Sequence, residues 1–207
     1  MEVNMRADLK NLAFVLEKLY GEEPLTPLLA QVLNKCLKQP GLVFQEIRAL
    51  TGNDTGELLL LAWDWKLLLP RRSGQCAEWD DRLMRFEPDE YYEMPNIVRW
   101  LLEIAVKTGA LDVDGAIAEL YDQMGEPAYE QMPKLVKEMA HRTKNLCITA
   151  AGIHAACRQA GFENRTGAMI AVLKGGGVIS PRLKSVSPSE NKGAPVYDVH
   201  PTVANLF

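Results

Sequence analysis

The sequence predicts a mainly α-helical protein of the α+β class, built from two related modules that a helical segment joins. Three observations predict this fold. Apolar residues recur at helical spacing through most of the 207 residues. Each half closes with two short apolar stretches around a run of turn formers, which is the pattern of a β-hairpin. The two halves also share an internal repeat.

The repeat relates TGELLLLAWDWKLLLPR at residues 55–71 to TGAMIAVLKGGGVISPR at residues 166–182, a constant offset of 111. Four of the seventeen positions are identical, and seven more are apolar in both copies. A short apolar stretch and a helix that ends on glycine precede each copy. Two generic amphipathic helices that happen to precede strands are the alternative. The repeat favours one fold used twice.

Each half gives the same order of elements. The predicted helices of the first half are residues 5–19, 25–38, 44–51 and about 54–64, and its strands are 42–44, 67–70 and 83–86. The predicted helices of the second half are residues 132–145, 149–160 and one that Asn164 or Thr166 caps, and its strands are 146–148, 178–183 and 195–199. Gly52 and Gly161 end the second helices, and Gly175, Gly176 and Gly177 let the last helix turn abruptly into a strand.

The residues between the modules read as a connector. EPDEYYEMP at 87–95 is acidic and bracketed by prolines, which is typical of a linker. Two amphipathic helices are then predicted at 96–107 and 113–124. The expected domains are therefore 1–88, a connector at 89–126, and 127–207. The leucines of the N-terminal helix predict that this helix is docked on its own chain or on a partner copy.

The order of elements in each half resembles the winged helix-turn-helix superfamily. That order is helix, strand, helix, turn, helix, strand, hairpin tip and strand. The resemblance covers both halves and rests on topology, not on a signature motif. It implies two tandem winged-helix modules. It also implies that the third helix of a module can enter a DNA major groove while the wing contacts the backbone or the minor groove.

Charge is unevenly distributed along the chain. The net charge is −4, but residues 141–194 hold eight Lys or Arg and only two Asp or Glu, giving +6. Residues 1–140 carry −9. An acidic body with a basic C-terminal module favours a polyanionic partner for that module. No apolar run is long enough for a membrane span, the N-terminus does not read as a signal peptide, and the cysteines form no CxxC pair, so we expect a cytoplasmic protein.

The third helix of the second half is the one suited to DNA. Its predicted outward residues Ala168, Ala171 and Gly175 are small and uncharged, so the backbone could approach a duplex closely. Recognition helices contact bases near their N-terminus, where Arg165 lies. A solvated basic face is the alternative. The expected DNA-binding residues are Arg165, Thr166, Lys174, Arg182, Lys184 and Lys192.

The third helix of the first half is chemically different. Its outward residues Glu57, Leu60 and Asp64 would place two carboxylates against phosphates. Bulky apolar groups are abundant around it, and tryptophan is enriched at interfaces. A large core is the alternative. The expected protein-contact residues are Leu60, Trp63 and Trp65.

No catalytic or cofactor signature is evident. The glycines at 175–177 follow a helix and precede a strand, the reverse of a phosphate-binding loop. His141, Cys147, His154 and Cys157 match no standard zinc spacing. We therefore expect no enzyme, cofactor or metal, but a DNA-binding protein of transcriptional regulation that acts through its C-terminal module. The alternative is a winged-helix adaptor or scaffold without DNA binding, and the N-terminal half could support a homodimer or a protein partner.

Overall fold

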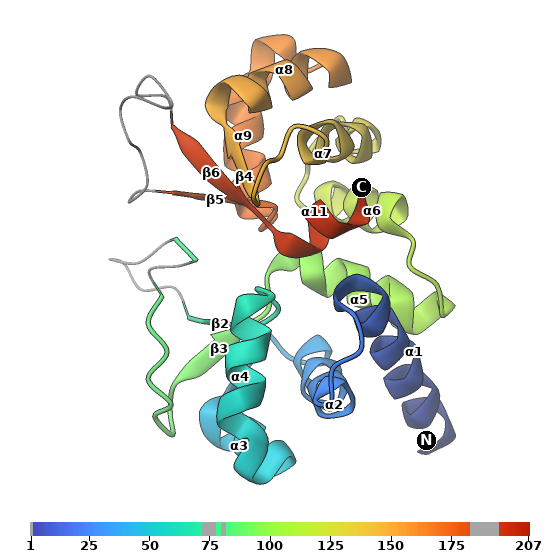
Figure 1. Ribbon diagram of the computed structural model, residues 1–207. Helices are drawn as coiled ribbons and strands as arrows, with labels where there is room; N and C mark the ends of the chain where they lie inside the picture. The colour runs from blue at the N-terminus through green and yellow to red at the C-terminus, as the bar shows by residue number, and fades with distance from the viewer. Residues whose placement is uncertain (1, 72–77, 80–81, 183–194) are drawn as a thin grey trace. The chain divides into compact units, whose positions relative to one another are not determined.

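The computed structural model describes residues 2–71, 78–79, 82–182 and 195–207. The chain is mainly helical with small antiparallel sheets, which confirms the α+β class (Figure 1). It divides into two compact units, Met1–Asp112 and Val113–Phe207, called here the first and the second unit. Within the described residues, no helix combines the length and the apolar character that crossing a membrane requires.

The first unit has five α-helices and three strands in its described part. The helices are α1 (Glu2–Tyr20), α2 (Thr26–Leu37), α3 (Phe44–Thr51), α4 (Thr55–Asp64) and α5 (Asn96–Thr108), with the 3-10 turn η1 (Gly52–Asp54) between α3 and α4. The strands are β1 (Gly41–Val43), β2 (Leu69–Pro70) and β3 (Tyr91–Glu93).

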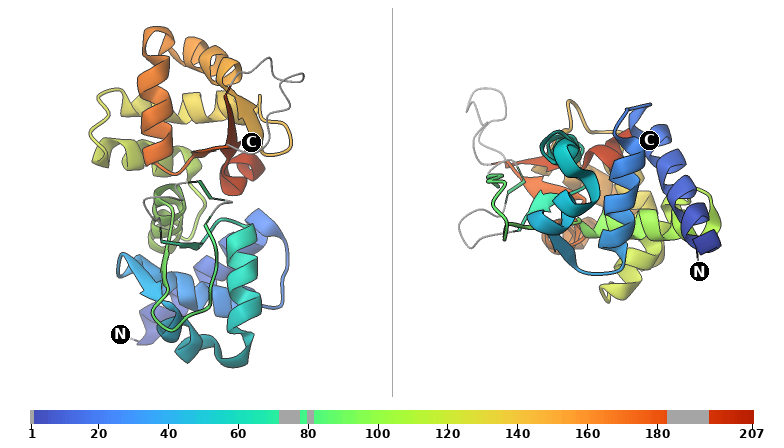
Figure 2. Two further views of the ribbon diagram at one scale, coloured as in Figure 1. Left: turned by 90° about the vertical axis from the view of Figure 1, so that its left-hand side faces the viewer. Right: turned by 90° about the horizontal axis from the view of Figure 1, so that it is seen from below.

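Helix α1 is docked on its own unit. Its side chains Leu12, Val15 and Leu16 are fully buried, and the helix packs against α2 and α5, as the two views of Figure 2 also show. Burying each leucine contributes about 1.5–3 kcal/mol relative to leaving it in water. The prediction of a docked N-terminal helix is confirmed, with its own chain as the partner.

The second unit repeats this order, including a helix after its last strand. Its helical elements are α6 (Val113–Gln123), η2 (Tyr129–Gln131), α7 (Met132–Ala140), α8 (Ala150–Ala160), η3 (Glu163–Arg165), α9 (Thr166–Gly175) and α11 (Pro201–Leu206). Its strands are β4 (Cys147–Thr149), β5 (Ile179–Pro181) and β6 (Val196–Val199).

The two sheets have the same topology. The strand orders are β1-β3-β2 and β4-β6-β5, so the last strand in sequence lies in the middle of each sheet. Pro70 pairs with Tyr92, and Pro181, 111 residues after Pro70, pairs with Tyr197. All four pairings are antiparallel. The internal repeat therefore corresponds to a repeated path of the chain from helix to sheet.

Caps and glycines explain where the repeated helices begin and end. The Thr149 hydroxyl accepts the backbone N–H of Gly152 at 3.1 Å, so Thr149 is the N-cap of α8. Gly161 follows α8 with φ +90°, and Gly177 follows α9 with φ +73°, backbone conformations that favour glycine. The prediction that the glycine run lets the last helix turn into a strand is confirmed at Gly177.

The predicted position of the third strand of the first unit was wrong. Residues 83–86 are not a strand, and the strand is Tyr91–Glu93, inside the expected acidic linker. The Glu90 carboxylate accepts the backbone N–H groups of Arg85 and Phe86 at 2.7–3.1 Å, which holds 83–86 in a loop. Two neighbouring strands pair with β3 and fix it in the sheet.

Other element boundaries also differ from expectation. The segment 89–126 is not a separate connector, because α5 packs against α1 in the first unit and α6 packs against α7 in the second. Helix α7 ends at Ala140 and not at 145, since Asn145 and Leu146 adopt positive φ angles of 50° and 58°, which a helix cannot include. Helix α11 was not expected.

Candidate functional site

Helix α9 presents a face of small residues to solvent. Ala168, Ala171 and Gly175 are exposed, as predicted, and so is Lys174. Met169 and Leu173 are fully buried and anchor the opposite side of the helix at a spacing of one turn. The exposed face has no bulky side chain other than Lys174, so another molecule could approach the helix backbone closely.

Helix α4 occupies the corresponding place in the first unit, with a different exposed face. Both helices span ten residues, and each α9 position lies 111 residues after its α4 counterpart. The counterparts of Ala168, Ala171 and Gly175 are Glu57, Leu60 and Asp64, which are also exposed. Leu60 has a relative exposure of 51%. The equivalent surface therefore has small uncharged side chains beside Lys174 in the second unit, and is acidic and apolar in the first unit.

Arg165, expected to contact bases, forms an ion pair within its own unit. Its guanidinium donates two hydrogen bonds to the Glu126 carboxylate, at 2.9 and 3.0 Å. The Glu126 side chain is only 4% exposed, whereas that of Arg165 is 44% exposed. Hydrogen bonding to Arg165 lowers the pKa of Glu126 below its ordinary value of 4.5. The Glu126 carboxylate also accepts the backbone N–H of Ala128 at 3.1 Å.

The exposure of this pair limits its strength. Removing Arg165 would leave the buried Glu126 carboxylate without a partner at a cost of about 1–3 kcal/mol, because water screens the half-exposed guanidinium. A bidentate contact between arginine and guanine is worth about 1–3 kcal/mol. In this structure the Arg165 guanidinium joins the start of α9 to the turn after α6.

The other expected cations are distributed differently. Arg182 donates a hydrogen bond to the Cys147 thiol and lies 3.5 Å from the Asp198 carboxylate. Desolvation by burial raises the pKa of Cys147, although the charge of Arg182 opposes the shift. Lys184 and Lys192 lie outside the described residues. Lys174 is thus the expected DNA contact that is both described and free of an ion pair.

Thr166, the first residue of α9, is engaged at its hydroxyl. Thr166 Oγ1 lies 3.0 Å from His154 Nδ1 and donates to the carbonyl oxygen of Glu163 at 3.3 Å. The Thr166 hydroxyl is therefore engaged within its own unit. Among the described residues, no three His, Cys, Asp or Glu side chains gather in a way that could hold a metal ion.

Two of the three expected protein-contact residues pack within the first unit. The Trp65 ring stacks on Tyr20 with centroids 4.2 Å apart. Trp63 is half-buried, and the Lys66 ammonium lies over its ring at 3.7 Å. Leu60 is the member of the set that is freely exposed.

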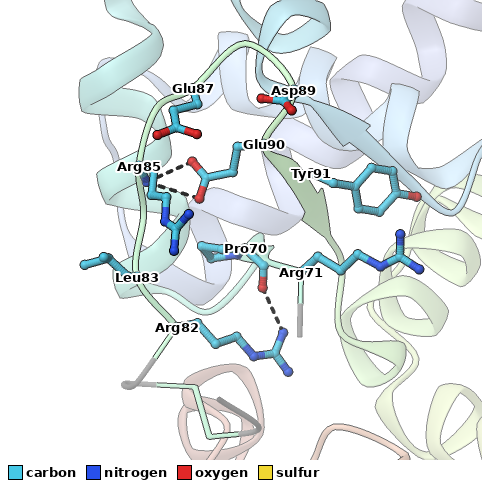
Figure 3. Close-up of a pocket in the computed structure, with 9 residues that line it drawn as sticks. All are labelled: Pro70, Arg71, Arg82, Leu83, Arg85, Glu87, Asp89, Glu90 and Tyr91. Carbon is cyan, nitrogen blue, oxygen red and sulfur yellow. Dashed lines mark hydrogen bonds between the residues drawn. The ribbon is translucent and has the colours of Figure 1, made fainter. Parts of the chain in front are cut away.

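A pocket of about 340 Å³ lies at the base of the hairpin of the first unit (Figure 3). Arg82 is buried there and donates to the Pro70 carbonyl at 3.1 Å and to Glu93 at 2.7 Å. This pocket was not predicted from the sequence, although the arginines of residues 71–85 were a signal for it. Equal numbers of arginines and carboxylates line it, so it has no clear preference for an anion or a cation. Its lining residues are Pro70, Arg71, Arg82, Leu83, Arg85, Glu87, Asp89, Glu90 and Tyr91.

Glu126 was also missed by the sequence analysis. It lies 39 residues before Arg165 in the chain. A glutamate between Gly125 and Pro127 reads locally as part of an exposed turn. Only the folded unit brings the two charges together.

Comparison with known proteins identifies a family but no activity. Residues 10–207 match the model of a protein family of unknown function, so the chain belongs to that family. No curated protein matches the chain. No solved structure matches it either.

Proposed function

We propose that this member of a family of unknown function binds double-stranded DNA through a winged helix in its second unit, with α9 facing the major groove. The exposed face of α9 carries the proposal. A major groove about 12 Å wide admits an α-helix, and Ala168, Ala171 and Gly175 would let the helix approach it closely. The order α8, α9, β5, β6 supports the winged-helix assignment. The proposal involves no catalytic step.

Charge supports the same face. Lys174 is exposed in the last turn of α9 and has no ion pair in the described part of the chain. A lysine in this place would neutralise a phosphate and release a counterion. On α4 the equivalent surface carries Glu57 and Asp64, which phosphates would repel. We therefore assign DNA binding to the second unit.

Matched charge insertions test the assignment. Ala171→Glu places a carboxylate in the centre of the exposed face of α9 and should abolish binding to a random duplex at low salt. Leu60→Glu makes the equivalent change on α4 and should leave DNA binding intact. Both positions are exposed, so both variants should fold. Equal loss of binding in the two variants, or no salt-dependent binding by the wild type, would contradict the proposal.

Lys174 gives a graded test. Lys174→Ala should weaken binding to every duplex alike and reduce the slope of log K against log salt by about one. Lys134→Ala, an exposed lysine of α7 in the same unit, is the control and should change neither quantity.

A second candidate function is a protein contact through α4. The observation that favours it is Leu60, a large apolar side chain 51% exposed between two carboxylates. A protein partner with an apolar centre and a basic rim would complement this surface. This adaptor function predicts that Leu60→Glu abolishes recovery of the partner from a cell extract, while Ala171→Glu does not. Identical recovery by both variants would contradict it.

A further inference from the structure

We propose that the second unit binds the phosphate backbone of duplex DNA, with little preference for sequence, because Glu126 holds Arg165, the arginine at the start of α9. The inference rests on the proposed DNA binding and narrows its ligand. A regulator of transcription needs a preference for particular sequences, so this property points away from an operator-specific repressor or activator.

The composition of α9 is the first argument. Base pairs are distinguished by side chains that make directed hydrogen bonds to base edges, chiefly Arg, Lys, Asn and Gln. Of the ten residues of α9, only Thr166 and Lys174 have polar side chains. The Thr166 hydroxyl is occupied by His154 and by the carbonyl oxygen of Glu163. Lys174 lies in the last turn, whereas recognition helices contact bases with their N-terminal residues.

The ion pair of Arg165 is the second argument. Arg165 immediately precedes α9 and has the right position and chemistry for a guanine edge. Glu126 engages Nη1 and Nη2, so Arg165 could use this end of its guanidinium on a guanine only if both hydrogen bonds broke. In the described part of the chain, no cation other than Arg165 contacts Glu126. A free guanine edge therefore competes poorly with this carboxylate.

Contacts of Ala168 and Ala171 with the DNA would determine the weak base preference that remains. Ala168 and Ala171 are exposed and could touch a thymine methyl group, the apolar feature of the major groove. Such a contact involves no buried hydrogen bond and gives weak discrimination. We expect a preference of less than about threefold at any base pair, against about 5- to 150-fold for a bidentate arginine contact.

Selection from a random pool tests the proposal with the full chain. The wild-type protein is incubated at low salt with duplexes that carry a randomised centre, and the bound fraction is sequenced. Enrichment below about threefold at every position is the expected result, and enrichment above about tenfold at any position would overturn the inference while leaving DNA binding in place. No duplex binding at low salt would overturn the proposed function and, with it, this inference.

The variant Glu126→Gln tests the assigned cause. It keeps an acceptor oxygen but removes the charge, so Arg165 is released toward the DNA. We expect one guanine position to become enriched and the salt slope to steepen by about one. Glu130→Gln, an exposed change in the neighbouring η2 turn, should retain the flat profile of the wild type. A flat profile in Glu126→Gln, shown by thermal unfolding to be folded, would overturn the role given to the ion pair.

Discussion

Helices α4 and α9 are the same element used twice, and they differ where they face solvent. The buried pairs are apolar in both, with Leu58 and Ala62 in α4 matched by Met169 and Leu173 in α9. The exposed faces share no chemistry. Packing against the same neighbouring elements limits the buried positions in both units, whereas no such limit acts on the surface. A difference in function between the units is therefore to be sought on these two faces.

The net charges of the two units differ in the same direction as the faces of α4 and α9, because the first unit is the more acidic. Residues 1–112 hold thirteen Lys or Arg against eighteen Asp or Glu, a net charge of −5. Residues 113–207 hold ten against nine, a net charge of +1. The acidic residues of the second unit include Glu126 and Asp198, which pair with Arg165 and Arg182. Part of the positive charge counted along the sequence is thus neutralised within the fold.

The residues that immediately precede α4 and α9, Asp54 and Arg165, give the largest expected difference in stability between the two units. Arg165→Ala should destabilise the second unit by about 1–3 kcal/mol, because the buried Glu126 carboxylate loses its half-exposed partner. Asp54→Ala changes the equivalent residue of the first unit, which is exposed, and should cost less than about 1 kcal/mol. Site-resolved hydrogen exchange in β6 and β3 measures the two units separately. Similar effects of the two substitutions would remove the contrast.

Position 41 breaks the equivalence of the two sheets. Gly41 pairs with Glu93 as Cys147 pairs with Asp198, but a Cβ atom on Gly41 would lie 2.2 Å from the carbonyl oxygen of Tyr92. Gly41→Ala should therefore destabilise the first unit by at least about 1–3 kcal/mol. Gly56→Ala, in α4 with open space around it, should instead stabilise that unit by about 0.5–1 kcal/mol. Urea unfolding that reports the same sign for both would contradict this account.

Acid should affect the second unit through Glu126. The pKa of Glu126 is lowered in the fold by Arg165, so the pair stabilises the unit above the ordinary pKa of 4.5. This stabilisation is lost as the pH falls through the lower folded-state value. In Glu126→Gln, the decline in stability of the second unit over this range should be shallower. Denaturant midpoints between pH 3 and 6 measure the difference, and parallel curves for the two proteins would contradict the prediction.

The N-caps of α3 and α8 give the smallest expected difference in stability between the two units. Thr149→Ala should cost about 1 kcal/mol in the second unit, because the backbone N–H of Gly152 loses its acceptor. The first unit has Val43 at that place, and there the Glu46 carboxylate accepts the Val43 N–H at 3.1 Å. Glu46→Ala should cost about 0.5 kcal/mol, since this carboxylate is partly exposed to water. Thermal unfolding of both variants gives the comparison.

Local signals were enough to place the repeated helices. Helix α3 spans Phe44–Thr51 as predicted, because Gly52 ends it. Strand β3 was missed because its position depends on pairing with β1 and β2, which are distant in sequence. The apolar pattern at 83–86 is a local signal without such pairing. Helix α11 was missed because it is short and its cap is unusual, with His200 Nδ1 accepting the N–H of Thr202.

The candidate site was less predictable than the fold. Helical periodicity correctly placed Ala168 and Ala171 on the exposed face. The same periodicity gave Arg165 a free side chain, since it contains no information about a glutamate 39 residues away. Burial by tertiary packing decides which charges are neutralised. The sequence could therefore identify the helix that faces solvent, but not which of its cations are available.

Each sheet places its last strand in the centre, and this sets when each unit can be completed during synthesis. Strands β1 and β2 have no partner until Tyr91–Glu93 has been made, and β4 and β5 have none until Val196–Val199 has been made. The first unit can therefore close while the second is still being translated. A chain interrupted before Val196 would contain all of α9 but not the strand that completes its sheet. The face proposed to meet DNA is thus assembled late, so incomplete chains would not compete for DNA.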